Sequence, residues 1–326
     1  MNFAPYIREI GRGAQGARNL TADAAEKLYA AILDDGMPEL ELGAVLLALR
    51  MKGETWEEMS GFLAAAEARA YSLTPPTPGV HPVVLPSYNG AHKGANLTPL
   101  LALMLQRFGV PVLVHGVLEG FGRVTSAQIF RELGHMPAAS HAEAQQQLDR
   151  QGLAFTPLSA LSPALAGLFL LRARLGVRNC THSLVKMLDP FRGKAVLVAA
   201  ATHPSWLDLM REVLCRKGQT TLLLRGTEGE PFANPLRRPR IELLRDGDCQ
   251  TLFEAERNSL KNLPYLPTGA DAIATAEWTH RVMEDRIPLP LPLANQLVCC
   301  LYACGIARDL NEAKALVSLE NRTQEI

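Results

Sequence analysis

The segment Leu113–Gly134, LVHGVLEGFGRVTSAQIFRELG, has the residue types of a loop that holds phosphate. An apolar run ends in His115 and a glycine-rich bend, and Arg123, small hydroxyl residues and a helical pattern follow. Glycine lets backbone N–H groups approach an anion, and the N-terminus of the next helix adds a partial positive charge. Glu119 lies in the same bend and opposes a compact anion, and no lysine follows the apolar run. The segment therefore predicts a phosphate loop that lacks its full set of cations.

Three further turns follow short apolar runs that are typical of strands: SYNGAHKGAN, ATHPS and RGTEGEP. In an open parallel sheet, the turns at the carboxyl ends of the strands meet along one edge, where ligands bind. We therefore expect basic residues and histidines from all four turns to converge on one rim. These residues are Lys93, Arg123 and Arg225, together with His92, His115 and His203.

The elements that carry these turns fall into two parts. Residues up to 70 have the pattern of three or four short helices, in which Thr21 and Thr55 are expected to be N-caps. A segment with four prolines, SLTPPTPGVHP, follows, and beyond it strands alternate with helices before the last fifty residues return to helix. This alternation favours an α/β fold with a mostly parallel sheet covered on both faces. We predict a helical domain in residues 1–74, a proline-rich linker in 75–82 and an α/β domain in 83–326.

The composition is that of a soluble globular protein. Of 326 residues, 48% are apolar and 20% are charged, and no apolar run approaches the roughly 18 residues of a membrane span. We expect no secretory signal, and the six scattered cysteines indicate reduced thiols in the cytoplasm. Cys299, Cys300 and Cys304 are the one group that could be imagined as metal ligands, and we favour a buried helix for them instead.

The formal net charge is zero, but the charges are unevenly distributed along the chain. Residues 172–240 contain 13 Lys and Arg against 5 Asp and Glu, a balance of +8. Arg174 and Arg178 have the spacing of neighbours on one helix face. A local positive field attracts anionic partners whatever the total charge. Whether this block of sequence forms one patch in space stays open at this point.

Several long stretches resemble the anthranilate phosphoribosyltransferases and class III nucleoside phosphorylases. They include LTADAAEKLYAAILDDGMPELELGAVLLALRMKGETWEEMSGF, NLTPLLALMLQRFGVPVLVHG and LRARLGVRNCTHSLVKMLDP, and the resemblance covers nearly the whole chain. It implies a small helical domain, usually the dimerising one, beside a larger α/β domain.

The substrate motifs of those enzymes are largely lost. Residues 86–90, PSYNG, stand where the enzymes have the glycine-rich loop that wraps pyrophosphate. The lysine, asparagine and arginine of a second motif are lost around His115, and the acidic pair that holds magnesium falls at Pro231 and Phe232. Without those carboxylates a Mg²⁺–pyrophosphate complex has little to hold it. The residues that we assign to this degenerate substrate loop are Tyr88, Asn89, Gly90, Asn96, His115 and Gly116.

These losses, and the GTEGEP stretch, resemble a divergent, YbiB-like branch of the superfamily. The resemblance implies a homodimer that binds nucleic acid without sequence preference and has no catalytic residue, metal or cofactor. Lys and Arg side chains would replace the counterions of the nucleic-acid backbone. The residues expected to bind nucleic acid are Lys93, Arg123, Arg172, Arg174, Arg178, Lys186, Arg192, Lys194, Arg225, Arg237, Arg238 and Arg240.

Two other functions stay open. The first is a glycosyltransferase- or phosphoribosyltransferase-type enzyme with altered loops, in which Arg172 holds a substrate carboxylate. The second is a scaffold dimer that binds no anion. Tyr88, Phe121 and Trp206 lie in or near the rim loops and would either stack on bases or pack in the core. Backbone contacts carry no sequence information, so the choice between DNA and RNA, and between single and double strands, also stays open.

Overall fold

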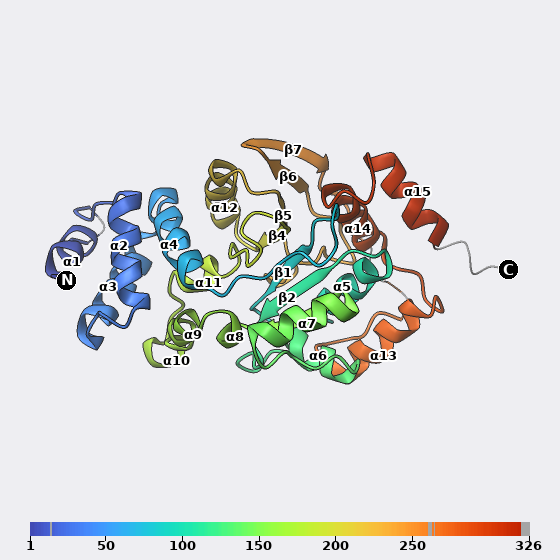
Figure 1. The fold of residues 1–326 in the computed structure, drawn as a ribbon, viewed down its shortest axis with the longest axis horizontal. Coiled ribbons are helices and arrows are strands. Elements are labelled where there is room, and N and C mark those ends of the chain that lie inside the picture. The colour runs from blue at the N-terminus through green and yellow to red at the C-terminus, as the bar shows by residue number, and fades with distance from the viewer. Residues whose placement is uncertain (14, 260–262, 264, 321–326) are drawn as a thin grey trace. The chain divides into compact units, whose positions relative to one another are not determined.

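The structure is a computed structural model that describes residues 1–320 apart from 14, 260–262 and 264. Contacts divide the chain into two compact units (Figure 1). The helical unit combines Met1–Ser72 with Leu158–Pro190, and the α/β unit combines Leu73–Pro157 with Phe191–Ile326. The sequence analysis assigns residues 158–190 to the α/β domain, whereas in the structure they form one compact unit with the first helices. Tyr29, which is fully buried, bonds Thr181 at 2.8 Å through its hydroxyl, and this contact ties the second segment to the first.

The first segment of the helical unit begins its helices as its sequence indicates. Thr21 accepts a hydrogen bond from Ala24 N, and Thr55 forms a capping box with Glu58. Both predicted N-caps are therefore confirmed, and α2 and α4 pack along each other (Figure 1). The helices are α1 (Ala4–Ile10), α2 (Ala22–Leu33), α3 (Glu39–Lys52) and α4 (Trp56–Arg69).

The second segment of the helical unit consists of short helices. They are α8 (Leu158–Leu161), α9 (Pro163–Leu170), α10 (Arg172–Leu175) and α11 (Thr181–Leu184). Gly176 has a φ of 72°, a left-handed conformation that ends α10. Arg178 lies beyond this break, so the expectation that Arg174 and Arg178 share one helix face is wrong.

The α/β unit is built on one seven-stranded sheet with the order β3-β2-β1-β4-β5-β6-β7. The strands from β3 to β5 are parallel, and β6 and β7 join antiparallel at one edge. The predicted fold class, a helical domain plus an α/β domain with a mostly parallel sheet, is confirmed. The strands are β1 (Val83–Ser87), β2 (Val112–Gly116), β3 (Leu153–Pro157), β4 (Val196–Ala201), β5 (Thr221–Arg225), β6 (Ile241–Arg245) and β7 (Asp248–Phe253).

Helices cover both faces of this sheet. Alternate strand residues such as Val83, Leu85 and Val198 share one apolar cluster with α5 and α14, and the residues between them are also buried. No helix in the described part of the chain is both long and apolar enough to cross a membrane. The helices are α5 (Thr98–Arg107), α6 (Ser126–Glu132), α7 (His141–Gln151), α12 (Pro204–Lys217), α13 (Ala272–Met283), α14 (Leu291–Ala303) and α15 (Leu310–Glu320).

The strand order has a switch point between β1 and β4. The chain runs from β1 outward to β2 and β3, and then returns to β4 and runs outward to β5. In such sheets the crevice for ligands lies beyond the carboxyl ends of the two central strands. The loop after β1 and the turns after β4 and β5 therefore border this crevice.

Candidate functional site

The loop that follows β1 holds a buried carboxylate from elsewhere in the chain. The backbone N–H groups of Asn89 and Gly90 donate to one oxygen of Glu230, at 2.7 and 2.8 Å. The hydroxyl of Thr98 donates to the other oxygen at 3.3 Å, and the Ser87 hydroxyl also donates to it. Glu230 is fully buried. A carboxylate in this setting is stable because each of its oxygens receives hydrogen bonds.

A second carboxylate, that of Glu228, comes from the same turn, two residues before Glu230 in the chain. Glu228 accepts hydrogen bonds from His92 N at 3.0 Å and Lys93 N at 2.9 Å, and it pairs with Arg123 at 3.4 Å. The tight turn between Thr227 and Glu230 directs both glutamates to the same loop. We call residues 87–93 together with these two glutamates the filled loop. Four of its backbone N–H groups, those of Asn89, Gly90, His92 and Lys93, donate to carboxylates of the chain itself.

Tyr88, a residue of this loop, contacts His115 of β2. The Tyr88 hydroxyl and His115 Nδ1 are 2.6 Å apart, and both residues are buried. Burial raises the pKa of Tyr88 well above its usual range. His115 is therefore enclosed instead of facing the rim as expected, and Tyr88 is not available to stack on a base.

The other residues of the predicted degenerate loop are structural neighbours of Tyr88 and His115. Asn96 donates to Ser126 Oγ at 3.2 Å and accepts from Thr98 N at 3.2 Å. A Cβ atom at Gly116 would overlap the carbonyl oxygen of Ser87, so only glycine fits there. The residues of the predicted degenerate loop thus belong to one hydrogen-bonded and closely packed region. They are Tyr88, Asn89, Gly90, Asn96, His115 and Gly116.

Beside the filled loop lies a cavity of about 820 Å³, all of it within the α/β unit. Lys93 comes from the loop after β1, Arg225 from the end of β5, and other arginines from α12 and the connection into β6. Among the residues that the structure describes, the lining contains six basic and two acidic residues, a balance of +4. We call this the basic cavity, and its charged residues are Lys93, Arg211, Arg225, Arg237, Arg238, Arg240, Glu228 and Glu242.

The cations of the basic cavity differ in how they are paired. Arg211 pairs with Glu242 at 2.8 Å, and Arg240 lies 3.2 Å from the same carboxylate. Arg238 pairs with Glu256 at 3.5 Å. Lys93 and Arg225 are exposed, and neither forms an ion pair with any residue that the structure describes. The cavity therefore retains positive charge that an added anion would neutralise.

The structure brings together only part of the predicted rim. Lys93 and Arg225 line the basic cavity, and Arg123 is paired with Glu228 at its border. His203 is exposed at the start of α12, and His92 contributes its backbone N–H. Arg211 was not singled out from the sequence, although it lies within the +8 segment and its place on α12 adds it to the lining.

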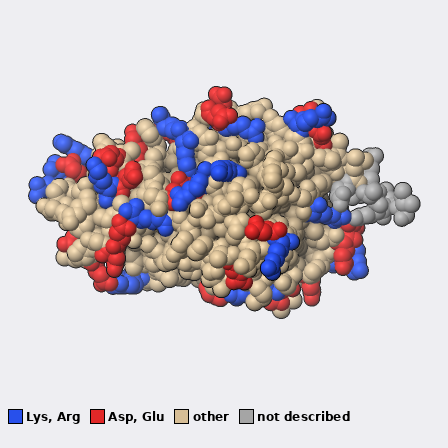
Figure 2. Space-filling view, viewed as in Figure 1, with Lys and Arg blue, Asp and Glu red and all other residues tan. Residues whose placement is uncertain are grey.

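Other predicted cations lie elsewhere in the α/β unit. Arg192 and Lys194 are exposed, but they precede β4 and so lie at the amino end of that strand. The basic cavity lies at the opposite end, where β5 finishes at Arg225. The +8 segment of the sequence is therefore not one patch. On the face shown in Figure 2, basic and acidic side chains are interspersed among the described residues.

The remaining predicted cations form a separate cluster in the helical unit. Arg174 makes two hydrogen bonds with Glu39, at 2.9 and 3.2 Å, and both side chains are well exposed. Arg172, Arg178 and Lys186 surround His182, which stacks on the ring of Phe169. Burial first, and then the charges of these three cations, lower the pKa of His182 to about 3. Lys186 itself is 7% exposed.

The cysteine cluster lies on α14. Cys299 and Cys300 are within that helix and Cys304 is its C-cap, and all three are buried free thiols in the apolar cluster. Burial raises the pKa of Cys299 to about 12 and that of Cys304 to about 11. Among the described residues, no group of His, Cys, Asp and Glu has an arrangement that could hold a metal ion.

Comparisons with known proteins give a family match in the first segment of the helical unit and relatives that cover nearly the whole chain. The helical bundle domain of a glycosyl transferase family matches residues 4–70. The protein of Escherichia coli (strain K12) with the name "Uncharacterized protein YbiB" is 41% identical over 98% of this chain and 99% of its own length. Anthranilate phosphoribosyltransferase of Methylocella silvestris is 28% identical over 95% of this chain and 88% of its own.

A solved structure supports the fold over most of the chain. The match to the crystal structure of anthranilate phosphoribosyltransferase from Thermus thermophilus covers 95% of this chain and 93% of that chain. The TM-score is 0.76 and the sequence identity is 24%. At that identity the likeness concerns the fold alone. The filled loop and the basic cavity are features of this chain's own residues.

Proposed function

Since the chain belongs to the family of YbiB, within the anthranilate phosphoribosyltransferase-like superfamily, we propose that it keeps this scaffold as a non-catalytic protein that binds nucleic acid. It would bind DNA, and RNA by the same contacts, without sequence preference, as a homodimer in the cytoplasm. The observation that carries this proposal is the basic cavity with its balance of +4. Contacts of Lys and Arg with phosphates supply affinity that does not depend on base sequence.

The filled loop supports a non-catalytic function. A loop that binds a small phosphorylated substrate needs free N–H groups, and here Glu230 and Glu228 accept from four of them. His115, the one histidine kept from the enzyme motifs, is buried against Tyr88 and has no access to a substrate in this arrangement. A general acid or base must reach the reacting group.

The shape of the basic cavity supports a polyanion as ligand. Its volume of about 820 Å³ would admit one nucleotide of a longer strand, and the exposed side chains of Lys93, Arg225 and Arg237 lie at its wall. The guanidinium groups of arginine match the geometry of phosphate oxygens. The cluster of Arg172, Arg174, Arg178 and Lys186 would add weaker contacts, because Arg174 is paired and Lys186 is buried.

The experiment that tests this function is binding of a labelled oligonucleotide of arbitrary sequence at low salt. We expect an affinity that falls linearly with salt on a log–log scale, by about 0.7 to 0.9 per phosphate contact. Calorimetry with phosphoribosyl pyrophosphate and Mg²⁺ tests the alternative, an enzyme with altered substrate loops. No oligonucleotide binding at low salt, or saturable binding of phosphoribosyl pyrophosphate, would count against the proposal.

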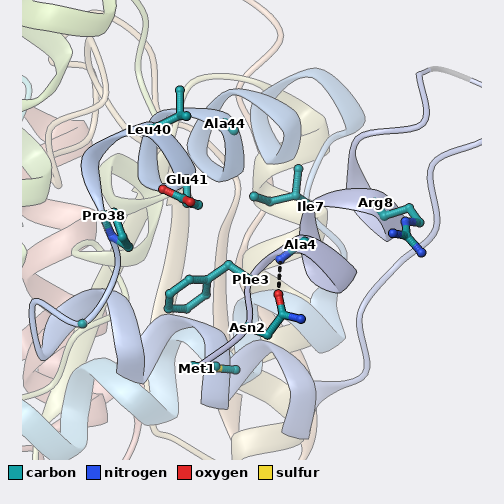
Figure 3. Close-up of a pocket in the computed structure, with 11 residues that line it drawn as sticks. Met1, Asn2, Phe3, Ala4, Ile7, Arg8, Pro38, Leu40, Glu41 and Ala44 are labelled. Carbon is teal, nitrogen blue, oxygen red and sulfur yellow. Dashed lines mark hydrogen bonds between the residues drawn. The ribbon is translucent and has the colours of Figure 1, made fainter.

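The homodimer would form through the helical unit. Leu40, Leu47 and Met51 lie on one side of α3 at helical spacing and are 83%, 49% and 78% exposed. Beside them, α1 and α3 border a cavity of about 650 Å³, in which Figure 3 shows Phe3 and Ile7 with Leu40. Exposed apolar surface of this kind marks a site of protein contact.

The dimer can be tested without nucleic acid. Leu47→Glu with Met51→Glu would place two charges in the proposed interface, and we expect light scattering to give the mass of a monomer. Ile273→Glu, at an exposed apolar residue of α13, is the matched control and should keep the dimer. A wild-type protein that is already monomeric would contradict this part of the proposal.

A further inference from the structure

The two glutamates of the filled loop differ in their access to solvent. Glu230 is fully buried and bonds only groups inside the fold. The side chain of Glu228 is 18% exposed, and Glu228 lines the basic cavity. The inner carboxylate is therefore enclosed, whereas the outer one lies where a ligand of the cavity would reach it.

The groups that hold Glu228 would equally suit a phosphate. Two adjacent backbone N–H groups, of His92 and Lys93, and the guanidinium of Arg123 all donate to its carboxylate. Arg123 is 33% exposed at its side chain, and Lys93 also lines the basic cavity. Successive N–H groups beside an arginine are a common way for proteins to bind an oxyanion.

The backbone of the turn holds Glu228 in an unfavourable conformation. Its φ is 53°, in the left-handed region, and Gly229 follows with a φ of 88°. A residue with a Cβ atom is disfavoured there by about 1 kcal/mol or more. The contacts of the carboxylate offset this strain, so their loss to a competing anion would leave the turn without that compensation.

We propose that His92 N, Lys93 N and Arg123 form a phosphate site that Glu228 occupies in the free protein, and that a phosphate of bound nucleic acid displaces Glu228. This inference rests on the proposed function for its ligand, but the site itself can be tested separately with inorganic phosphate. Glu228 then acts as an internal competitor. It neutralises Arg123 until a polyanion binds in the basic cavity.

The test compares two variants with a matched control. Glu228→Ala empties the site, and Glu228→Gly does the same with a residue that suits the positive φ, in case the first variant folds poorly. Glu256→Ala is the control, because Glu256 also accepts a backbone N–H, from Arg238 at 2.9 Å, and pairs with an arginine of the basic cavity. It removes the same charge without opening the proposed site.

Two measurements are made on each full-length protein: the shift of thermal unfolding with inorganic phosphate, and the salt-dependent affinity for an oligonucleotide. We expect phosphate to stabilise the Glu228 variants but neither the wild type nor Glu256→Ala. The Glu228 variants should bind the oligonucleotide about tenfold more tightly at low salt, since the phosphate no longer has to displace a hydrogen-bonded carboxylate.

The other outcomes separate this inference from the proposed function. If all proteins bind the oligonucleotide alike and phosphate stabilises none of them, the displacement of Glu228 is wrong while the proposed function stands. If phosphate stabilises the Glu228 variants but no protein binds the oligonucleotide, the proposed function is wrong, and nucleic acid is not the anion that displaces Glu228. Equal gains in Glu256→Ala would also overturn the inference, because general charge would then explain them.

Discussion

The filled loop and the basic cavity lie side by side in the α/β unit, and both present groups that attract anions. In the filled loop these groups are mostly backbone N–H donors, and the chain's own carboxylates already accept from them. In the basic cavity the groups are long cationic side chains, and Lys93 and Arg225 stand without an acidic partner among the described residues. The inner part of the loop, where Glu230 is fully buried, is thus closed to a small phosphorylated substrate, while the cavity remains open to a polyanion.

The same contrast separates the basic cavity from the cations of the helical unit. Arg174 is engaged by Glu39, and Arg172, Arg178 and Lys186 surround a buried neutral histidine. Composition alone makes the two groups look alike, since both belong to the +8 segment. Their pairing and burial distinguish them, and the following changes test that distinction.

The largest effect should follow from Glu230→Ala. This change removes the shared acceptor of two N–H groups of the filled loop and of the hydroxyls of Ser87 and Thr98, and a buried unsatisfied group costs about 1 to 3 kcal/mol. We expect the free energy of unfolding in urea to fall by roughly 3 kcal/mol or more. Glu143→Ala, which removes an acceptor of one backbone N–H at the start of α7, should cost about 1 kcal/mol. Equal losses would mean that the filled loop is not a tightly held structure.

A smaller effect should appear in the pH dependence of stability through His182. Its pKa is about 3 in the folded state against 6.5 in the unfolded state, so the unfolded state binds more protons between these values. The stability that comes from His182 being neutral is complete above pH 6.5 and is lost as the pH falls toward 3. Between pH 6.5 and 5 we expect the wild type to lose roughly 2 kcal/mol more than His182→Gln. If the stability of the two proteins changed with pH in parallel, burial and the neighbouring cations would not lower the pKa of His182 as stated.

The smallest effect should come from Arg174→Glu. Arg174 is exposed and already paired with Glu39, and exposed ion pairs contribute about 0 to 1 kcal/mol. We expect the affinity for an oligonucleotide to fall by about threefold or less, a change of roughly 0.6 kcal/mol. Fluorescence anisotropy at low salt measures this directly. A loss as large as that of a charge reversal in the basic cavity would place the principal interface in the helical unit.

Much of the fold follows from local sequence patterns. Thr21 and Thr55 begin helices because their hydroxyls accept backbone N–H groups that a helix leaves free, and this preference acts over three residues. The short apolar runs mark the parallel strands for a similar reason, since a strand covered on both faces is apolar throughout. The β6–β7 hairpin was not predicted, although Asp246-Gly247 is a typical two-residue hairpin turn and both residues have positive φ values.

The candidate site was less predictable because it depends on contacts between distant parts of the chain. Glu228 and Glu230 belong to the GTEGEP stretch, and their acceptor role requires the loop after β1, some 140 residues earlier. The separation of Arg192 and Lys194 from Arg225 follows from strand direction, which places them at opposite ends of the sheet. Charge counted along the sequence does not contain that information.

The most direct test of the central claim is the salt dependence of oligonucleotide binding when the basic cavity is reversed in charge. The cavity variant combines Arg225→Glu, Arg237→Glu and Arg240→Glu in one protein. The control variant combines Arg131→Glu, Arg150→Glu and Arg308→Glu, at exposed arginines of the same unit that lie outside the cavity. For the cavity variant we expect an affinity lower by about 100-fold or more at low salt, and a log–log salt slope shallower by about 2 to 3. The control should lose little. An unchanged slope in the cavity variant, or an equal loss in the control, would contradict the assignment of the basic cavity as the nucleic-acid interface.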